Sequence, residues 1–201
     1  NILTPSLKSK YTQFLVFFAA SKNAFVADRF LGSLVAFLFS KDAQLSSHHS
    51  SKPLNNTPAK AKSIRIASCF LSSFIKNAPF LNYAQVKSTC ELLLDWIGRK
   101  VEALAHYSKS TTEIYIISSV LCCLLEIVTV YPDLISYISS SSLNDSIKIS
   151  YPSIPLHIRQ NKVLEPLYSE IGLIENTNQP QVSQFHPFNP LELPLCKQFI
   201  L

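Results

Sequence analysis

The sequence predicts an all-α protein, an α-solenoid of helical hairpins with an extended strap at its C-terminal end. Its long apolar segments repeat their hydrophobic residues at steps of three or four, which is the period of an amphipathic helix. No segment of strand period competes with them, and the 201 residues include only three glycines, too few for many tight hairpins. With 47% hydrophobic and 15% charged residues, the chain is expected to form a single domain over 1–201.

The first two helices are predicted over 8–20 and 24–39. In the first, four large apolar residues are expected on one side: Tyr11, Phe14, Leu15 and Phe18. In the second, apolar residues fall at every fourth position, at Val26, Phe30, Leu34 and Leu38. Arg29 and Ser33 are placed on the opposite, solvent-facing side.

A polar segment, 41–60, separates this pair from the next and is predicted to be a mobile loop, because it is rich in serine and asparagine and contains two prolines. Four serines in it are candidate phosphorylation sites: Ser46, Ser47, Ser50 and Ser51. Each phosphate would add about −1.5 to −2 charges beside a basic half of the chain. The alternative is a solvated spacer with no regulatory role.

In the next pair of helices, the first is predicted to begin after Pro58 and the second at Tyr83. The first of them is predicted to end near Asn77, because Pro79 follows. The second has the clearest stripe in the chain, formed by Tyr83, Val86, Cys90, Leu93, Ile97, Val101 and Leu104. Trp96 is assigned to a core. The opposite face is polar, and its charges at 87 and 91 and at 95 and 99 are spaced to pair.

The fifth helix, predicted over 112–131, is apolar enough to suggest a membrane span. Glu126 interrupts it, serines dilute it, and its length is marginal for a bilayer, so a central buried helix is favoured. A short helix over 132–139, a serine linker over 139–142 and a last helix over 161–173 complete the prediction.

The predicted helix pairs begin near residues 9, 63 and 112. When part of the loop is discounted, their spacing approaches the ~40–47 residues of HEAT-type helical repeats. The sequence begins with Asn1 and contains no methionine, so we expect it to be a piece of a longer protein. Some aromatic residues of the first helix would then face a preceding repeat, and we expect the chain alone to self-associate through them.

No catalytic or metal-binding motif is found. HExxH, GxSxG, P-loop and GxGxxG patterns are missing from the sequence, and the five histidines have no metal-ligand spacing with the cysteines. The odd number of cysteines, five, without a CxxC pair favours reduced, buried thiols. We therefore expect no enzymatic activity, no cofactor and no metal.

The net charge of +5 is unevenly distributed, with +9 over 1–110 and −4 over 111–201. A basic face for an acidic partner is one interpretation, and an uneven solvated surface is the other. The basic residues do not form a recognisable nucleic-acid module, so no direct sequence-specific DNA binding is expected. A protein-binding scaffold is the better interpretation, because solenoids hold macromolecules on extended surfaces.

The C-terminal stretch "QFHPFNPLELPLCKQFI", 184–200, is too apolar for an ordinary disordered tail and too rich in proline for a regular helix. We expect an extended segment over 178–201 that either lies along the last helices as a strap or binds a partner. Its candidate contact residues are Phe185, Pro187, Phe188, Pro190 and Leu193.

Two stretches resemble signatures of the RNA polymerase I-specific transcription initiation factor family, of TIF-IA type. The first is "ASCFLSSFIKNAPFLNYAQVKSTCELLLDWI", 67–97, and the second is the "FHPFNPLELPLCKQFI" of 185–200. Matching positions in the first are Leu71, Ser73, Phe74, Ala78, Phe80, Val86, Lys87, Ser88, Leu92, Leu93 and Trp96. Asn189 stands where the family pattern of the second has aspartate. "YTQFLVFFAA" and "FVADRFLGSLVAFLF" resemble the helices that precede the first signature, so the resemblance extends over nearly the whole chain.

The resemblance implies a non-enzymatic HEAT-repeat protein of the nucleus and nucleolus, and the chain would be the C-terminal half of that helical domain. It would bind RNA polymerase I and join it to the promoter-bound core factor, so that ribosomal RNA genes are transcribed. The alternative left open by the residues alone is a generic HEAT-type scaffold or transport adaptor, with no membrane association in either case.

Overall fold

All the regular secondary structure in the described part of the chain is helical. The computed structural model describes residues 10–46, 57–106, 111–138 and 141–173, and none of these lies in a strand. The all-α prediction is therefore confirmed for the described residues. Helix contacts divide the chain into two compact units whose boundary lies between Val86 and Lys87, and the single domain expected from composition stays a prediction.

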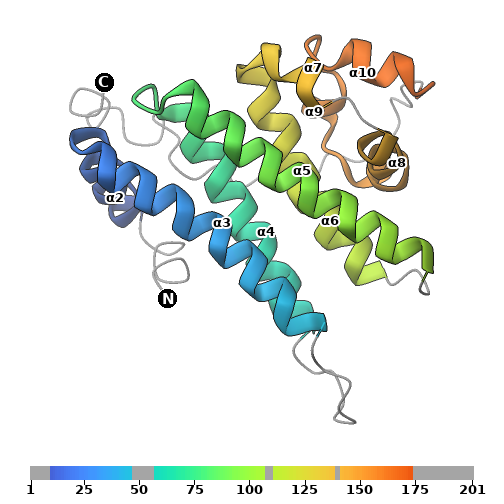
Figure 1. Cartoon of the computed structure of the whole chain (residues 1–201), viewed down its shortest axis with the longest axis horizontal. Coiled ribbons are helices and arrows are strands. Elements are labelled where there is room, and N and C mark those ends of the chain that lie inside the picture. Colours follow the sequence, from blue (N-terminus) through green and yellow to red (C-terminus); the bar gives the residue numbers. More distant parts are fainter. Residues whose placement is uncertain (1–9, 47–56, 107–110, 139–140, 174–201) are drawn as a thin grey trace. The chain divides into compact units, whose positions relative to one another are not determined.

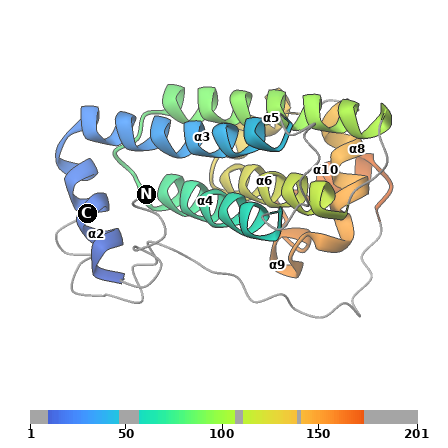
Figure 2. The same cartoon turned by 90° about the horizontal axis from the view of Figure 1, so that it is seen from below.

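The first unit is built on α2 (Lys10–Lys22), α3 (Ala24–Ser46) and α4 (Thr57–Asn77). α3 and α4 run side by side in opposite directions, and α2 is steeply inclined to α3 (Figures 1 and 2). α3 and α4 both extend into the segment 41–60 that was predicted as a loop, because α3 continues to Ser46 and α4 begins at Thr57. Residues 47–56 lie outside the described part.

An aromatic cluster forms the centre of the first unit. The Phe74 ring on α4 is fully buried and meets the ring of Phe30 on α3 edge to face, with centroids 4.9 Å apart. Phe17 of α2 and Phe80, which follows α4, contact the same ring at 5.7 and 6.1 Å. Burying each such ring stabilises the fold by roughly 1.5–3 kcal/mol, so the cluster holds the three helices together.

Asparagine caps fix where two of the helices begin. Asn23 accepts a hydrogen bond from the backbone N–H of Phe25 at 2.9 Å, and it is the single residue between the end of α2 and the start of α3. Asn82 and Gln85 form a reciprocal capping box at the start of α5 (Tyr83–His106), with N···O distances of 2.8 and 3.1 Å. Gln85 also donates to the Asp28 carboxylate of α3 at 3.2 Å.

The second unit contains the rest of α5, α6 (Thr111–Val130) and a series of short elements. These are η1 (Pro132–Leu134), α7 (Ile135–Ile138), α8 (Ser141–Ser150), η2 (Tyr151–Ser153), α9 (Leu156–Arg159) and α10 (Glu165–Glu170). α6 is packed by α8, η1, η2 and α9. By length and apolar composition α6 alone among the described helices would be able to cross a bilayer, but 61% of that stretch is buried inside the protein. It is therefore the central helix of this unit, as predicted.

Several sequence-based expectations about the helices are wrong. Phe14, Leu15 and Phe18 were expected on one side of the first helix, but Phe14 is buried together with Phe17, whereas Leu15 and Phe18 are 68% and 41% exposed. α2 is apolar on more than one side, so periodicity cannot decide which side is inside. Tyr83, placed on the core stripe of α5, is 43% exposed, because it lies at the first residue of that helix, ahead of the packed turns.

The serine linker and the last helix also differ from expectation. α8 begins inside the predicted linker 139–142, because Leu143 and Ile147, four residues apart, are both fully buried. The predicted helix 161–173 is reduced to α10, whose end is set by Gly172 at a φ of 69°. The N–H groups of Gly172 and Leu173 return to the carbonyls of Ser169 and Tyr168, both at 3.1 Å, which is the Schellman arrangement.

Candidate partner-binding surface

The corner between α2 and α3 carries large apolar side chains that do not enter the core. Phe25, just after the Asn23 cap, is 67% exposed, and Leu15 and Phe18 are exposed on the outer face of α2. Phe14, Phe17 and Ala20 supply the inner face and are buried. Because the inner face satisfies the packing of α2, the outer residues are free for contacts with another molecule.

Each exposed aromatic ring at this corner has a cation above it. The Lys22 ammonium lies 5.4 Å from the Phe18 ring centroid, and the Arg29 guanidinium lies 5.5 Å from that of Phe25. Both are within the range of cation–π attraction. Together Leu15, Phe18, Lys22, Phe25 and Arg29 are called the corner surface below. Aromatic residues and arginine are the types that dominate binding energy at protein interfaces.

The outer face of α5 is different, since its charges pair with one another. Arg99 and Asp95 form an ion pair at 2.9 Å, and Lys87 lies 3.9 Å from Glu91, as their spacing predicts. Lys87 also lies 4.0 Å above the Tyr137 ring of α7. These exposed pairs each contribute little to stability, and their charges are largely compensated within the chain.

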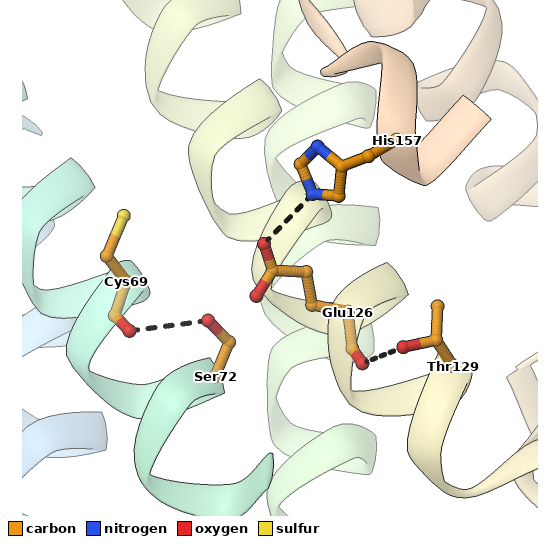
Figure 3. Close-up of polar contacts among 5 residues, drawn as sticks. All are labelled: Cys69, Ser72, Glu126, Thr129 and His157. Carbon is orange, nitrogen blue, oxygen red and sulfur yellow. Dashed lines mark hydrogen bonds and ion pairs between the residues drawn. The ribbon is translucent and has the colours of Figure 1, made fainter. Parts of the chain in front are cut away.

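One carboxylate is buried on the central helix of the second unit. The Glu126 side chain is 9% exposed, and His157 Nε2 of α9 lies 3.8 Å from its Oε1 (Figure 3). The Thr129 hydroxyl donates back to the Glu126 carbonyl at 2.7 Å, so it stays within α6. The contact joins α9 to α6. No group of three or more metal-ligating side chains occurs in the described ranges.

Four described cysteines take part in no disulfide bond: Cys69, Cys90, Cys122 and Cys123. Burial, and secondarily the Glu91 carboxylate, raises the pKa of Cys90 to about 12. A thiol this difficult to ionise is unreactive at neutral pH, which indicates a packing role.

None of the site residues proposed from sequence belongs to the corner surface, and nearly all of them lie outside the described residues. Phe185, Pro187, Phe188, Pro190 and Leu193 fall in 174–201, which is outside the described residues. Ser47, Ser50 and Ser51 also lie outside them. Ser46 is the last residue of α3, and its side chain is not described.

Comparison with known protein families gives a match for this chain. The family described as RNA polymerase I specific transcription initiation factor RRN3 matches residues 1–115. The chain belongs to this family. Its members act with RNA polymerase I in the initiation of ribosomal RNA synthesis, which is a nuclear process, so the resemblance noted in the sequence is confirmed. No curated protein and no solved structure matches the chain.

The RRN3 match includes the whole of the corner surface, all of α5 and the start of α6, but not the C-terminal stretch 184–200. The corner surface was not recognised from sequence. Arg29 was correctly placed on the outer side of its helix, but Leu15 and Phe18 were placed on the same side of the first helix as Phe14, which is buried. The sequence did predict that the aromatic residues of the first helix could not all face one core, but it did not indicate which of them are exposed.

Proposed function

We propose that this RRN3-family chain binds RNA polymerase I and joins it to the promoter-bound core factor, without enzymatic activity of its own. The corner surface forms part of the polymerase-binding surface. The observation that carries this proposal is the exposure of Phe25 and Leu15, at 67% and 68%, inside the segment that matches the family. The family supports the polymerase as partner, and the exposed side chains support where it binds.

Charge supports the same surface. Residues 1–110 carry a net charge of +9, and Lys22 and Arg29 lie over the exposed rings of the corner surface. An acidic region of the polymerase with an apolar centre would complement it, because a rim of opposite charge steers association while buried aromatic anchors hold the complex. Because ribosomal RNA genes are transcribed in the nucleolus, we expect the protein to act in the nucleus and in its nucleolus.

The arrangement proposed for the helices is a HEAT-type solenoid. The antiparallel α3–α4 hairpin and the long α5 and α6 are the elements that such repeats require. A solenoid presents extended surfaces, and it would allow one end to hold the polymerase while another part contacts the core factor.

Affinity purification of the tagged chain tests the proposal. The parent chain is expected to recover polymerase I subunits, and the variant Leu15→Ser/Phe25→Ser is expected to recover at least tenfold less. The matched control is Leu92→Ser/Tyr137→Ser, which removes two side chains that are also about half exposed but lie in the second unit. Equal loss in both variants would reject the corner surface, and recovery of transport or vesicle-coat proteins without polymerase would reject the function.

A further inference from the structure

A hollow in the second unit contains two polar groups for which the fold supplies no partner. It lies beside α9 and α10 and has a volume of about 570 Å³. Its lining includes Tyr151, Arg159, Lys162, Glu165 and Tyr168. All of them lie outside the segment that matches the RRN3 family, so the family assignment does not explain them.

Arg159 is the first of these groups. Its side chain is only 6% exposed, and its Nε atom is buried without a hydrogen-bond acceptor. No carboxylate of the described residues forms an ion pair with it; its guanidinium lies 5.3 Å from the Tyr151 ring centroid instead. An arginine is almost never buried to this degree without a counter-charge, because desolvating an unpaired cation costs several kcal/mol. The buried position of Arg159 therefore favours the binding of an anionic group.

Tyr168 is the second. Its side chain is 5% exposed, and its hydroxyl is buried without a partner. Burial raises the pKa of this phenol above its usual value, so the hydroxyl keeps its proton and is available as a donor. The ring meets Tyr151 edge to face at 5.9 Å, which fixes its orientation. Gly172 and Leu173, which form the Schellman turn, also line the hollow.

We propose that this hollow binds an acidic segment of a partner protein, with one aspartate or glutamate carboxylate accepting hydrogen bonds from Arg159 and Tyr168. The guanidinium plane suits a carboxylate, which can accept two hydrogen bonds from it. The tyrosine rings and Leu173 offer apolar surface to the residues beside the carboxylate. The volume of the hollow falls in the range of ligand-binding pockets, about 300–1,000 Å³, so it can hold a few side chains of a bound peptide.

The charges of the lining favour a carboxylate over a phosphoryl group. Arg159 and Lys162 contribute two positive charges and Glu165 one negative charge, so the lining is +1. A single carboxylate neutralises this charge. A phosphate carries about −1.5 to −2 charges, so it would leave the site net negative and would be repelled by the Glu165 carboxylate. The proposal is independent of the corner surface, which lies in the first unit.

An array of nine-residue peptides tests the proposal with the full 201-residue chain. Each peptide has aspartate at its centre and varied flanking residues, and each has counterparts with asparagine or phosphoserine at that position. We expect a subset of aspartate peptides to bind and their asparagine counterparts to bind at least tenfold more weakly. Phosphoserine counterparts that bind more tightly would overturn the choice of a carboxylate, and an array without aspartate-dependent binding would overturn the site.

Substitutions then locate the binding. Arg159→Gln is expected to weaken the selected peptide at least tenfold, and Tyr168→Phe, which removes only the hydroxyl, about fivefold. Because Arg159→Gln alters a buried position, Lys162→Gln at the exposed rim provides a second cation variant and is expected to weaken binding about threefold. Lys148→Gln, on α8 and outside the lining, is the matched control and should bind like the parent.

Equal binding by Tyr168→Phe, Lys162→Gln and the parent would overturn the assignment to this hollow. Measuring the binding of glutarate at millimolar concentration tests whether the bound carboxylate comes from a small diacid instead of a peptide. If glutarate alone binds as tightly as the best peptide, the occupant is a metabolite and the proposal of a partner segment is wrong.

Discussion

The ring of Phe17 meets the ring of Phe74 edge to face, with centroids 5.7 Å apart and planes at 81°. Phe17 is 3% exposed and Phe74 is fully buried, so this contact is the centre of the joint between α2 and the α3–α4 hairpin. Phe80 extends it, with its ring 5.6 Å from that of Phe17. The exposed side of α2 can be offered to a partner because this inner contact holds the helix in place.

Replacing Phe74 with alanine should lower the free energy of unfolding of the first unit by about 3–5 kcal/mol, since it leaves a cavity touching three other rings. Phe25→Ala removes the same side chain from an exposed position and should change that free energy by less than about 0.5 kcal/mol. Urea unfolding followed by circular dichroism measures both. Equal losses for the two variants would contradict the assignment of inner and outer faces.

Stability should fall at high pH in a manner that depends on Cys90. Burial, with a smaller contribution from Glu91, raises the pKa of its thiol from 9.0 to about 12. Between these values the unfolded chain releases the thiol proton and the folded chain retains it. The contribution of Cys90 is therefore complete below pH 9 and is lost as the pH rises toward 12, with a slope of about 1.4 kcal/mol per pH unit.

Urea unfolding at pH 8, 9.5 and 10.5 tests this for the parent and for Cys90→Ala. The variant is less stable at every pH because it loses packing, but its stability should decline less steeply above pH 9. Burial, and secondarily Cys90, raises the pKa of Tyr131, so the difference in slope reports the thiol together with its smaller effect on Tyr131. Parallel curves would show that Cys90 ionises equally in the two states.

Periodicity in the sequence was a good guide where one helix face is clearly polar. On α5 it correctly placed Glu91, Asp95 and Arg99 outside and Leu93 and Ile97 inside. It failed for α2, whose aromatic residues occupy more than one face, and packing against Phe74 decides which of them are buried. It also missed α8 and α9, because helices of ten and four residues are too short to display a period.

The hollow beside α10 was beyond prediction from sequence for a different reason. Arg159 and Tyr168 are ordinary residues in a stretch that carries no motif. They become informative only when the fold buries both and leaves their polar atoms without partners. The Gly172 turn, which helps to shape the hollow, depends on a positive φ that one glycine in a sequence does not indicate.

Self-association of the chain should depend on the corner surface. Leu15, Phe18 and Phe25 together expose apolar area that a second copy could cover. Light scattering coupled to size-exclusion chromatography should show a mass that increases with protein concentration. Leu15→Ser/Phe25→Ser should stay monomeric over the same range, whereas Leu92→Ser/Tyr137→Ser should behave like the parent. A parent that remains monomeric at high concentration would contradict the prediction.

Regulation through the segment between α3 and α4 is tested by its serines. Replacing Ser46, Ser47, Ser50 and Ser51 with alanine removes the proposed phosphorylation sites while keeping the length of the segment. If these serines are phosphorylated, growth-dependent control of ribosomal RNA synthesis should weaken in cells that carry the variant. Unchanged control, measured by labelling of new ribosomal RNA, would indicate that the segment is only a spacer.

The aromatic residues of 184–200 should act as a strap. Pro187, Pro190 and Pro194 restrict their own φ angles, so ordering this segment costs less conformational entropy than ordering a flexible tail. Burying each phenylalanine contributes roughly 1.5–3 kcal/mol, and two anchors would hold the segment down. Phe185→Ala/Phe188→Ala should therefore lower the melting temperature by several degrees. Phe199→Ala removes a third anchor of the same stretch and should also lower the melting temperature, by less than the double variant. If the double variant melts like the parent but no longer recovers polymerase I, the segment is a docking motif and the strap is wrong.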